Sequence, residues 1–268
     1  MNLDQASMQS PLNFKEMGSG QPLIILHGLF GSARNWRRIG DTLKSHWRVV
    51  LPDLPNHGNS PWSDDMSYPA QAEALKNFIV RRDLANPVIV GHSMGGKVAM
   101  ALALSGQCLI NRLVIVDIAP VSYQHSHFEL IQAMRTLPLA QISTRHDADQ
   151  LLAPAIPTSG LRQFLLQNLI IENRQARWRI NLPIIEQQMT LLTGFPFTKE
   201  NFDTPTLFLH GSKSDYLSAA NLPIIKKFFP QAVTQSIDDA SHWLHVERPD
   251  EVAKAIQGFL EESTDPTI

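Results

Sequence analysis

The stretch "GHSMG" at residues 91–95 places a serine, Ser93, between two glycines, directly after an apolar run and before a helical pattern. Small neighbours permit the sharp turn that lifts a serine hydroxyl clear of a sheet. By itself Gly-x-Ser-x-Gly is a weak signal, because a helix N-cap serine beside two convenient glycines gives the same letters. Its position at a strand-to-helix junction, where parallel sheets bind ligands, favours a nucleophile. We therefore predict that Ser93 attacks an acyl carbon.

A serine hydroxyl needs a base to take its proton. Of the ten histidines, His242 follows the last strand candidate, "TQSID" at residues 234–238, and precedes the final helix, as the order nucleophile, acid, base requires. We expect His245 to be a packing or surface histidine on the following turn and His27 to brace a loop by hydrogen bonding. His92 is next to the nucleophile, but its side chain should point away from it on a strand. His242 is thus the predicted base.

The acid that orients the imidazole has two candidates. Asp117 ends the apolar run "RLVIVD" and should reach the same sheet edge as Ser93, whereas Asp215 lies in the loop after "TLFLHG", where a serine stands third after Gly211. A carboxylate buried beside isoleucines is costly without a partner, and His242 could be that partner. This geometry favours Asp117, with Asp215 as the alternative.

Backbone N–H groups are expected to bind the oxyanion. One belongs to Met94, at a helix N-terminus that favours negative charge. The other should come from the loop "HGLFGS", from Leu29 rather than Phe30, since the glycines of that loop let it turn its amides inward. A plain glycine turn is the alternative reading of this loop.

Five short apolar runs must position these residues: 22–28, 47–55, 87–92, 112–120 and 206–211. Their continuous hydrophobicity is typical of strands covered on both faces, and helical patterns lie between them, as in 32–46, 68–84 and 248–262. The sequence predicts an α/β protein with a doubly wound, mostly parallel sheet. We assign residues 1–120 and 202–268 to this core.

The alternation stops between about residues 121 and 201, where amphipathic stretches but no strand candidates occur. We expect this segment to be a helical lid, inserted between two late strands, that supplies an acyl pocket. A lid must bury an apolar face whatever its function, so its apolar residues are candidates for packing as well as for substrate contact. The candidates are Phe164, Leu165, Leu169, Trp178 and Ile180, with Phe30 from the core.

Composition excludes several other classes of protein. The 268 residues carry a formal net charge of −2, which offers no basic surface for nucleic acid or an anionic membrane. The single cysteine excludes an internal disulfide and a cysteine-rich metal site. No apolar run reaches the roughly 18 residues of a membrane span, and residues 1–14 lack the features of a secretory signal. We predict a cytoplasmic protein.

Several stretches together resemble the YbfF-type esterases of the α/β-hydrolase superfamily. They are "HGLFGS" (27–32), "NHGNS" (56–60), "GHSMGGKVAM" (91–100), "VDIAPV" (116–121), "QFLLQNL" (163–169), "WRINLP" (178–183) and "HWLHVERP" (242–249). The resemblance implies the α/β-hydrolase fold, hydrolysis of carboxylic esters or acyl thioesters such as acyl-CoA, no metal or organic cofactor, and an acid on the "DIAP" segment, which matches Asp117. The chain departs at Pro55, where the family has arginine, and at Ser241, where it has glycine.

The predicted reaction transfers a short- to medium-chain acyl group from a small-molecule ester to Ser93 and then to water. Carbon–carbon bond hydrolysis or lyase chemistry on the same triad is the alternative within the fold. From a different class, the chain could be a non-catalytic binding protein on a hydrolase scaffold. Failure to react with a serine-directed phosphonate would favour that reading.

Overall fold

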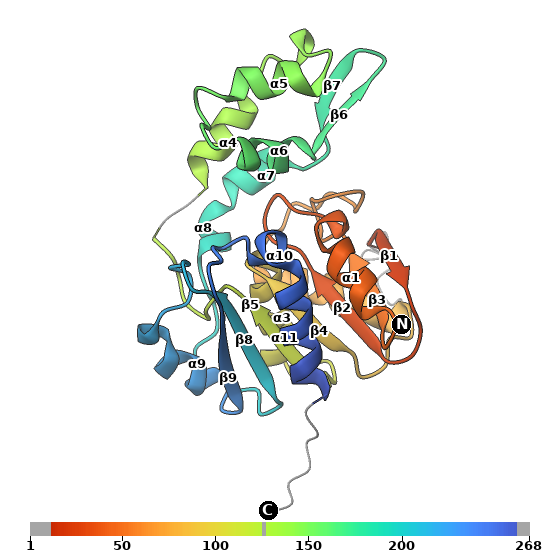
Figure 1. Ribbon diagram of the computed structural model, residues 1–268, viewed down its shortest axis with the longest axis vertical. Coiled ribbons are helices and arrows are strands. Elements are labelled where there is room, and N and C mark those ends of the chain that lie inside the picture. Colours follow the sequence, from red (N-terminus) through yellow and green to blue (C-terminus); the bar gives the residue numbers. More distant parts are fainter. Residues whose placement is uncertain (1–11, 125–126, 262–268) are drawn as a thin grey trace, which may run out of the picture.

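The computed structural model describes residues 12–124 and 127–261. Most of the N-terminal stretch used above to argue against a secretory signal lies outside these residues. The described chain contains a seven-stranded sheet and, between its strands β5 and β8, an insertion that rises above the carboxyl ends of the strands (Figure 1).

The sheet has the strand order β1-β3-β2-β4-β5-β8-β9, and every neighbouring pair except β1 and β3 is parallel. The strands are β1 (Phe14–Met17), β2 (Pro22–Leu26), β3 (Arg48–Pro52), β4 (Val88–His92), β5 (Arg112–Val116), β8 (Thr206–Gly211) and β9 (Ala232–Ile237). The predicted doubly wound, mostly parallel sheet is therefore confirmed. Sequence analysis missed the antiparallel edge strand β1, whose "FKEM" is short and half polar.

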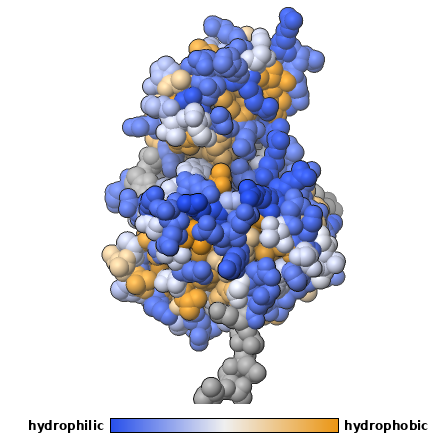
Figure 2. All heavy atoms as spheres, viewed as in Figure 1, coloured by the Kyte–Doolittle hydropathy of each residue, from blue (hydrophilic) through white to orange (hydrophobic). Residues whose placement is uncertain are grey.

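Both faces of the sheet are covered, which explains the continuous apolar runs. Along β2, Leu23 and Ile25 pack in one cluster while Ile24 and Leu26 pack in another. The first cluster includes α1 (Arg37–Leu43) and α11 (Pro249–Glu261), and the second α2 (Tyr68–Arg81), α3 (Met94–Leu104) and α9 (Leu222–Phe228). The face of the molecule in Figure 2 is mostly hydrophilic, with patches of hydrophobic side chains.

The insertion contains α4 (Phe128–Arg135), the 3₁₀ turn η3 (Leu139–Gln141), α5 (Arg145–Leu152), α6 (Ser159–Leu166), α7 (Leu182–Gln187) and α8 (Met189–Thr193). The expectation that it has no strands is wrong, because β6 (Leu169–Glu172) and β7 (Gln175–Trp178) form an antiparallel hairpin. Asn173 and Arg174 make its turn with φ of 50° and 60°, the left-handed pair of a tight hairpin. Without glycine, "NR" gave no turn signal. The lid boundaries at 121 and 201 stay a prediction.

Candidate active site

Ser93 lies between β4 and α3 with φ 52° and ψ −118°, a strained conformation for a residue with a side chain. Glycines make this turn possible. A Cβ on Gly91 would lie 2.4 Å from the carbonyl oxygen of Gly95, and one on Gly95 would lie 2.5 Å from that of His27. The elbow is therefore built by close backbone packing around the serine.

The structure brings the three predicted triad residues together from the ends of three strands. Ser93 Oγ lies 3.1 Å from His242 Nε2, and His242 Nδ1 lies 2.7 Å from Asp117 Oδ2. His242 is on the loop between β9 and α10 (Leu244–Glu247), and its ring stacks on Tyr216 with centroids 3.9 Å apart. An imidazole held in this way can accept the serine proton while the carboxylate stabilises the charge.

Asp117 directly follows β5 and is completely buried. Its Oδ1 accepts a hydrogen bond from the Gly211 amide at 3.0 Å, and its Oδ2 accepts one from the Ser214 hydroxyl as well as facing His242. These donors satisfy a carboxylate that burial would otherwise penalise. The alternative acid, Asp215, is exposed to solvent, and its neighbour Ser214 is the residue that reaches Asp117.

Ser214 was missed by sequence analysis, although it is the serine that stands third after Gly211. A second missed residue is His92, whose Nε2 lies 2.9 Å from the backbone carbonyl oxygen of His242. Burial holds the pKa of His92 well below its usual value, so the neutral ring donates its Nε2 proton to that carbonyl. The His92 side chain thus reaches the loop of the predicted base.

His27 and His245 make the kinds of contact expected from the sequence. His27 Nε2 accepts the amide proton of Leu54 at 2.9 Å, which braces the loop after β3. His245 is buried and stacks on Trp36 with centroids 4.8 Å apart.

The two predicted oxyanion donors lie next to the nucleophile. Met94 is the first residue of α3, and Leu29 lines the same pocket as Ser93. The amide of Phe30 is already used, since it donates to Nε2 of His57 at 3.3 Å. Burial lowers the pKa of His57 to about 3, so this ring is neutral and Nε2 accepts, while Nδ1 donates to the carbonyl of Pro55. The geometry therefore favours Leu29 over Phe30.

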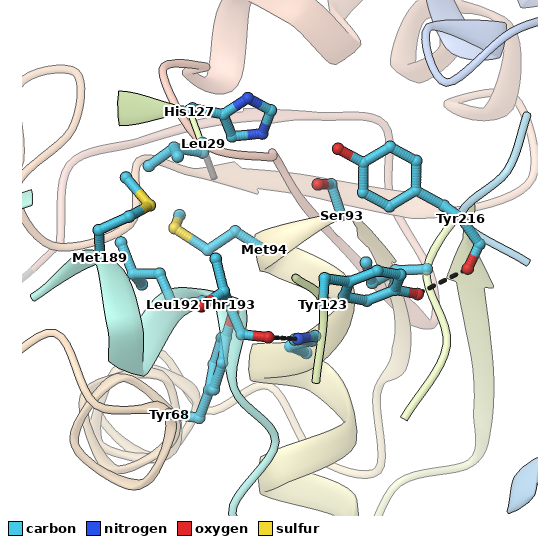
Figure 3. Close-up of a pocket in the computed structure, with 12 residues that line it drawn as sticks. Leu29, Tyr68, Ser93, Met94, Tyr123, His127, Met189, Leu192, Thr193 and Tyr216 are labelled. Carbon is cyan, nitrogen blue, oxygen red and sulfur yellow. Dashed lines mark hydrogen bonds between the residues drawn. The ribbon is translucent and has the colours of Figure 1, made fainter. Parts of the chain in front are cut away.

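A pocket opens beside Ser93 between the core and the insertion (Figure 3). Its apolar wall includes Leu29, Met94, Ile118, Met189 and Leu192, and its polar or aromatic residues include Tyr68, Lys97, Tyr123, His127, Thr193 and Tyr216. A second hollow, on the side of Phe30 and Trp243, shares Leu29, Ser93 and His127 with it. Both hollows reach the hydroxyl that would attack.

Most lid residues expected to contact substrate are packed inside the insertion instead. Leu165, Leu169 and Ile180 are at most 1% exposed and line neither hollow, because the faces that carry them form the apolar interior of the insertion. The indole N–H of Trp178 donates to the carbonyl of Met134. Phe164 packs edge-on against Trp243 at 4.5 Å, and Phe30 lines the second hollow.

Polar contacts join the insertion to the loops of the site. The Asn168 side chain donates to the carbonyl of Phe30 at 2.7 Å, and the Tyr68 hydroxyl donates to the carbonyl of Leu192 at 2.6 Å.

Ser241, one of the two departures from the family pattern, binds the Glu247 carboxylate through its amide and hydroxyl. That contact orders the turn before His242.

Within the described residues, no cluster of histidine, cysteine, aspartate and glutamate has the arrangement of a metal site. Over the same residues, none of the helices combines the length and hydrophobicity needed to cross a bilayer.

The architecture of the α/β-hydrolase fold is present in this chain. It has a serine at a strained elbow after β4, a carboxylate after β5, a histidine in the loop after β9, and an insertion between β5 and β8. The model of the alpha/beta hydrolase family matches residues 23–255, and the chain belongs to this family. It is 38% identical to the sn-1-specific diacylglycerol lipase ABHD11 of Danio rerio, over 96% of this chain and 86% of that protein. It is 33% identical to Esterase YbfF of Escherichia coli, over 90% and 94% of the two chains.

Among solved structures, a marine microorganism esterase superimposes with a TM-score of 0.89 at 38% identity, covering 93% of this chain and 99% of that one. The resemblance to YbfF-type esterases is therefore confirmed. The prediction of a carboxylic ester hydrolase is also confirmed, because relatives of this chain are named esterase and lipase.

Proposed function

We propose that the protein hydrolyses carboxylic esters through an acyl-enzyme intermediate on Ser93. The observation that carries the proposal is the continuous hydrogen-bonded relay from Ser93 through His242 to Asp117, with distances of 3.1 and 2.7 Å. Relatives named esterase and lipase support the same reaction class.

In the first half of the cycle His242 takes the proton of Ser93 while Oγ attacks the ester carbonyl carbon. Asp117 stabilises the resulting imidazolium, and the amides of Leu29 and Met94 donate to the oxyanion. Collapse of the tetrahedral intermediate breaks the bond to the alcohol oxygen, which leaves with the proton from His242. The acyl group then remains on Ser93.

In the second half, His242 takes a proton from water, whose oxygen attacks the acyl carbon, and returns that proton to Ser93 as the acid departs. The leaving group is an alcohol, or a thiol in a thioester such as an acyl-CoA. The pocket beside Ser93 would take a short- to medium-chain acyl group from a small-molecule substrate. No step calls for a cofactor, and the cytoplasm stays the predicted location.

The test is turnover of p-nitrophenyl esters of increasing acyl length by the wild type and Ser93→Ala. We expect hydrolysis by the wild type alone, with a length profile that sizes the pocket. A fluorophosphonate should label the wild type at Ser93. Equal turnover by both proteins would refute Ser93 as the nucleophile. Absence of both labelling and turnover would refute a serine esterase and favour a binding role.

A further inference from the structure

The pocket beside Ser93 contains a buried lysine that the proposed cycle does not use. Lys97 lies on α3 one helical turn after Ser93, is 1% exposed, and lines the pocket. Its ammonium donates to the carbonyls of Thr193 at 3.0 Å and Gly194 at 2.7 Å. The bond to Thr193 is drawn in Figure 3. Lys97 therefore brings a positive charge into the pocket beside Ser93.

This charge has incomplete compensation. Within residues 12–124 and 127–261, no carboxylate forms an ion pair with Lys97, and two of its three N–H groups have acceptors. The aromatic faces of Tyr123 and Tyr68, with centroids at 4.8 and 5.6 Å from Nζ, add a weaker attraction. Buried charges are normally paired, so the remaining N–H is suited to an anionic acceptor.

The pKa of Lys97 agrees with an incompletely compensated charge. Burial lowers the pKa of Lys97 to about 7, because the ammonium loses its hydration. A bound anion would supply the missing compensation and favour the charged form.

The hydroxyl groups of Tyr68 and Tyr123, the two tyrosines whose rings face Lys97, do not compete for this role. Tyr68 donates its proton to the Leu192 carbonyl, and Tyr123 donates its proton to the Tyr216 carbonyl at 2.6 Å. Asp117 lies behind the pocket, already bonded to Gly211 and Ser214. Lys97 is thus the cationic donor that a group extending from Ser93 along α3 would meet.

We propose that Lys97 determines specificity by binding a carboxylate at the far end of the acyl group, so that favoured substrates are monoesters or monothioesters of short dicarboxylic acids. This rests on the proposed function, because it requires the acyl group on Ser93 to occupy this pocket.

The experiment compares matched ester pairs at pH 7: monoethyl glutarate against ethyl valerate, and monoethyl adipate against ethyl hexanoate, followed by ethanol release. Ethyl esters avoid the rapid attack of the terminal carboxylate on a nitrophenyl ester. The wild type should have the higher kcat/KM for the carboxylate ester of at least one pair. In Lys97→Met that ratio should fall about 10- to 100-fold, the value of a hydrogen bond to a charged group. Lys254→Met is the matched control, because Lys254 is exposed. In this variant the ratio of the two kcat/KM values should stay unchanged.

Lys97→Gln keeps donors for the Thr193 and Gly194 carbonyls without the charge, and it should show the same loss of ratio if Lys97→Met does not fold. A parallel fall for both esters, with the ratio kept, would show that the lysine only holds the end of α8 and would overturn the inference. So would a wild type that prefers the neutral ester of both pairs. If the wild type hydrolysed no ester and resisted the fluorophosphonate, the proposed function would fail, and this inference with it.

Discussion

Ser93 combines a hydroxyl 3.1 Å from His242 with a backbone conformation that glycine would adopt more easily. Ser93→Ala should therefore abolish turnover, with kcat lower by at least about 10³-fold, while the fold is kept. Ser93→Gly should also be inactive, but more stable by about 1 kcal/mol because the strained turn is relieved. Ester turnover and urea unfolding of both variants measure these effects. Loss of folding in Ser93→Ala would mean that the serine is structural.

The choice of acid is tested by a matched pair of substitutions. Asp117→Asn removes the charge that stabilises the imidazolium of His242, so kcat should fall by about 10³- to 10⁴-fold. Asp215 is exposed, and Asp215→Asn should leave kcat within about two-fold. A larger loss in Asp215→Asn would reverse the assignment.

His92 is expected to act as a positioning residue, because its Nε2–H holds the carbonyl of the predicted base, His242. His92→Leu should lower kcat about 10- to 100-fold while KM stays within about two-fold, since a small displacement of a catalytic group is costly. His92→Gln keeps an N–H donor and should recover part of the rate. If KM and kcat moved together and glutamine gave no rescue, the histidine would be only part of the packing.

The three triad residues could be predicted from sequence because Ser93 and Asp117 directly follow recognisable strands and His242 lies in the loop after the last strand. Parallel strands deliver their carboxyl ends to one edge of the sheet. The residues that support the triad could not be predicted. Ser214, His92 and Asn168 make their contacts with chain 97, 150 and 138 residues away. Only the folded arrangement of loops brings such partners together.

At the scale of elements, the strands found from sequence are those buried on both faces, where hydrophobicity is continuous. The edge strand β1 and the hairpin β6–β7 carry mixed residues and were missed. In the insertion, apolar side chains at helical spacing indicated helices correctly but not which face meets the pocket. Leu165 and Leu169 therefore turned out to be interior residues.

The junction of β4 and α3 requires glycine at position 95, and the effect of replacing it on the free energy of unfolding can be measured. In Gly95→Ala, the new Cβ would meet the His27 carbonyl oxygen at 2.5 Å, and that atom belongs to a backbone that cannot easily move. We expect a loss of about 1–3 kcal/mol in the free energy of unfolding, together with reduced turnover.

Gly258, on α11, is the matched control, since a Cβ there would meet no atom within 4 Å. Gly258→Ala should raise the free energy of unfolding by about 0.5–1 kcal/mol through helix propensity. Urea unfolding of Gly95→Ala and Gly258→Ala measures the two changes in the free energy of unfolding. Equal effects in the two would show that close packing does not govern the elbow.

At the scale of the whole molecule, four histidines are buried in and around the site: His27, His57, His92 and His245. Burial lowers the pKa of each, to about 3 for His57 and His245, so the folded protein holds them neutral. In the unfolded chain they take up protons below a pKa of about 6.5.

The unfolded state therefore binds more protons than the folded state as the pH falls through 6.5, and the free energy of unfolding must decrease. Each buried histidine contributes a slope of up to about 1.4 kcal/mol per pH unit below 6.5, and the four together up to about 5.5. Urea unfolding at several pH values between 7 and 5 should show a steep fall. His245→Phe, which can still stack on Trp36, should reduce the slope by about a quarter. His46→Gln should not change it, because that side chain is exposed in both states. A flat profile would mean that the buried rings take up protons without unfolding, and that the polar interior around the site is more open to water than its burial indicates.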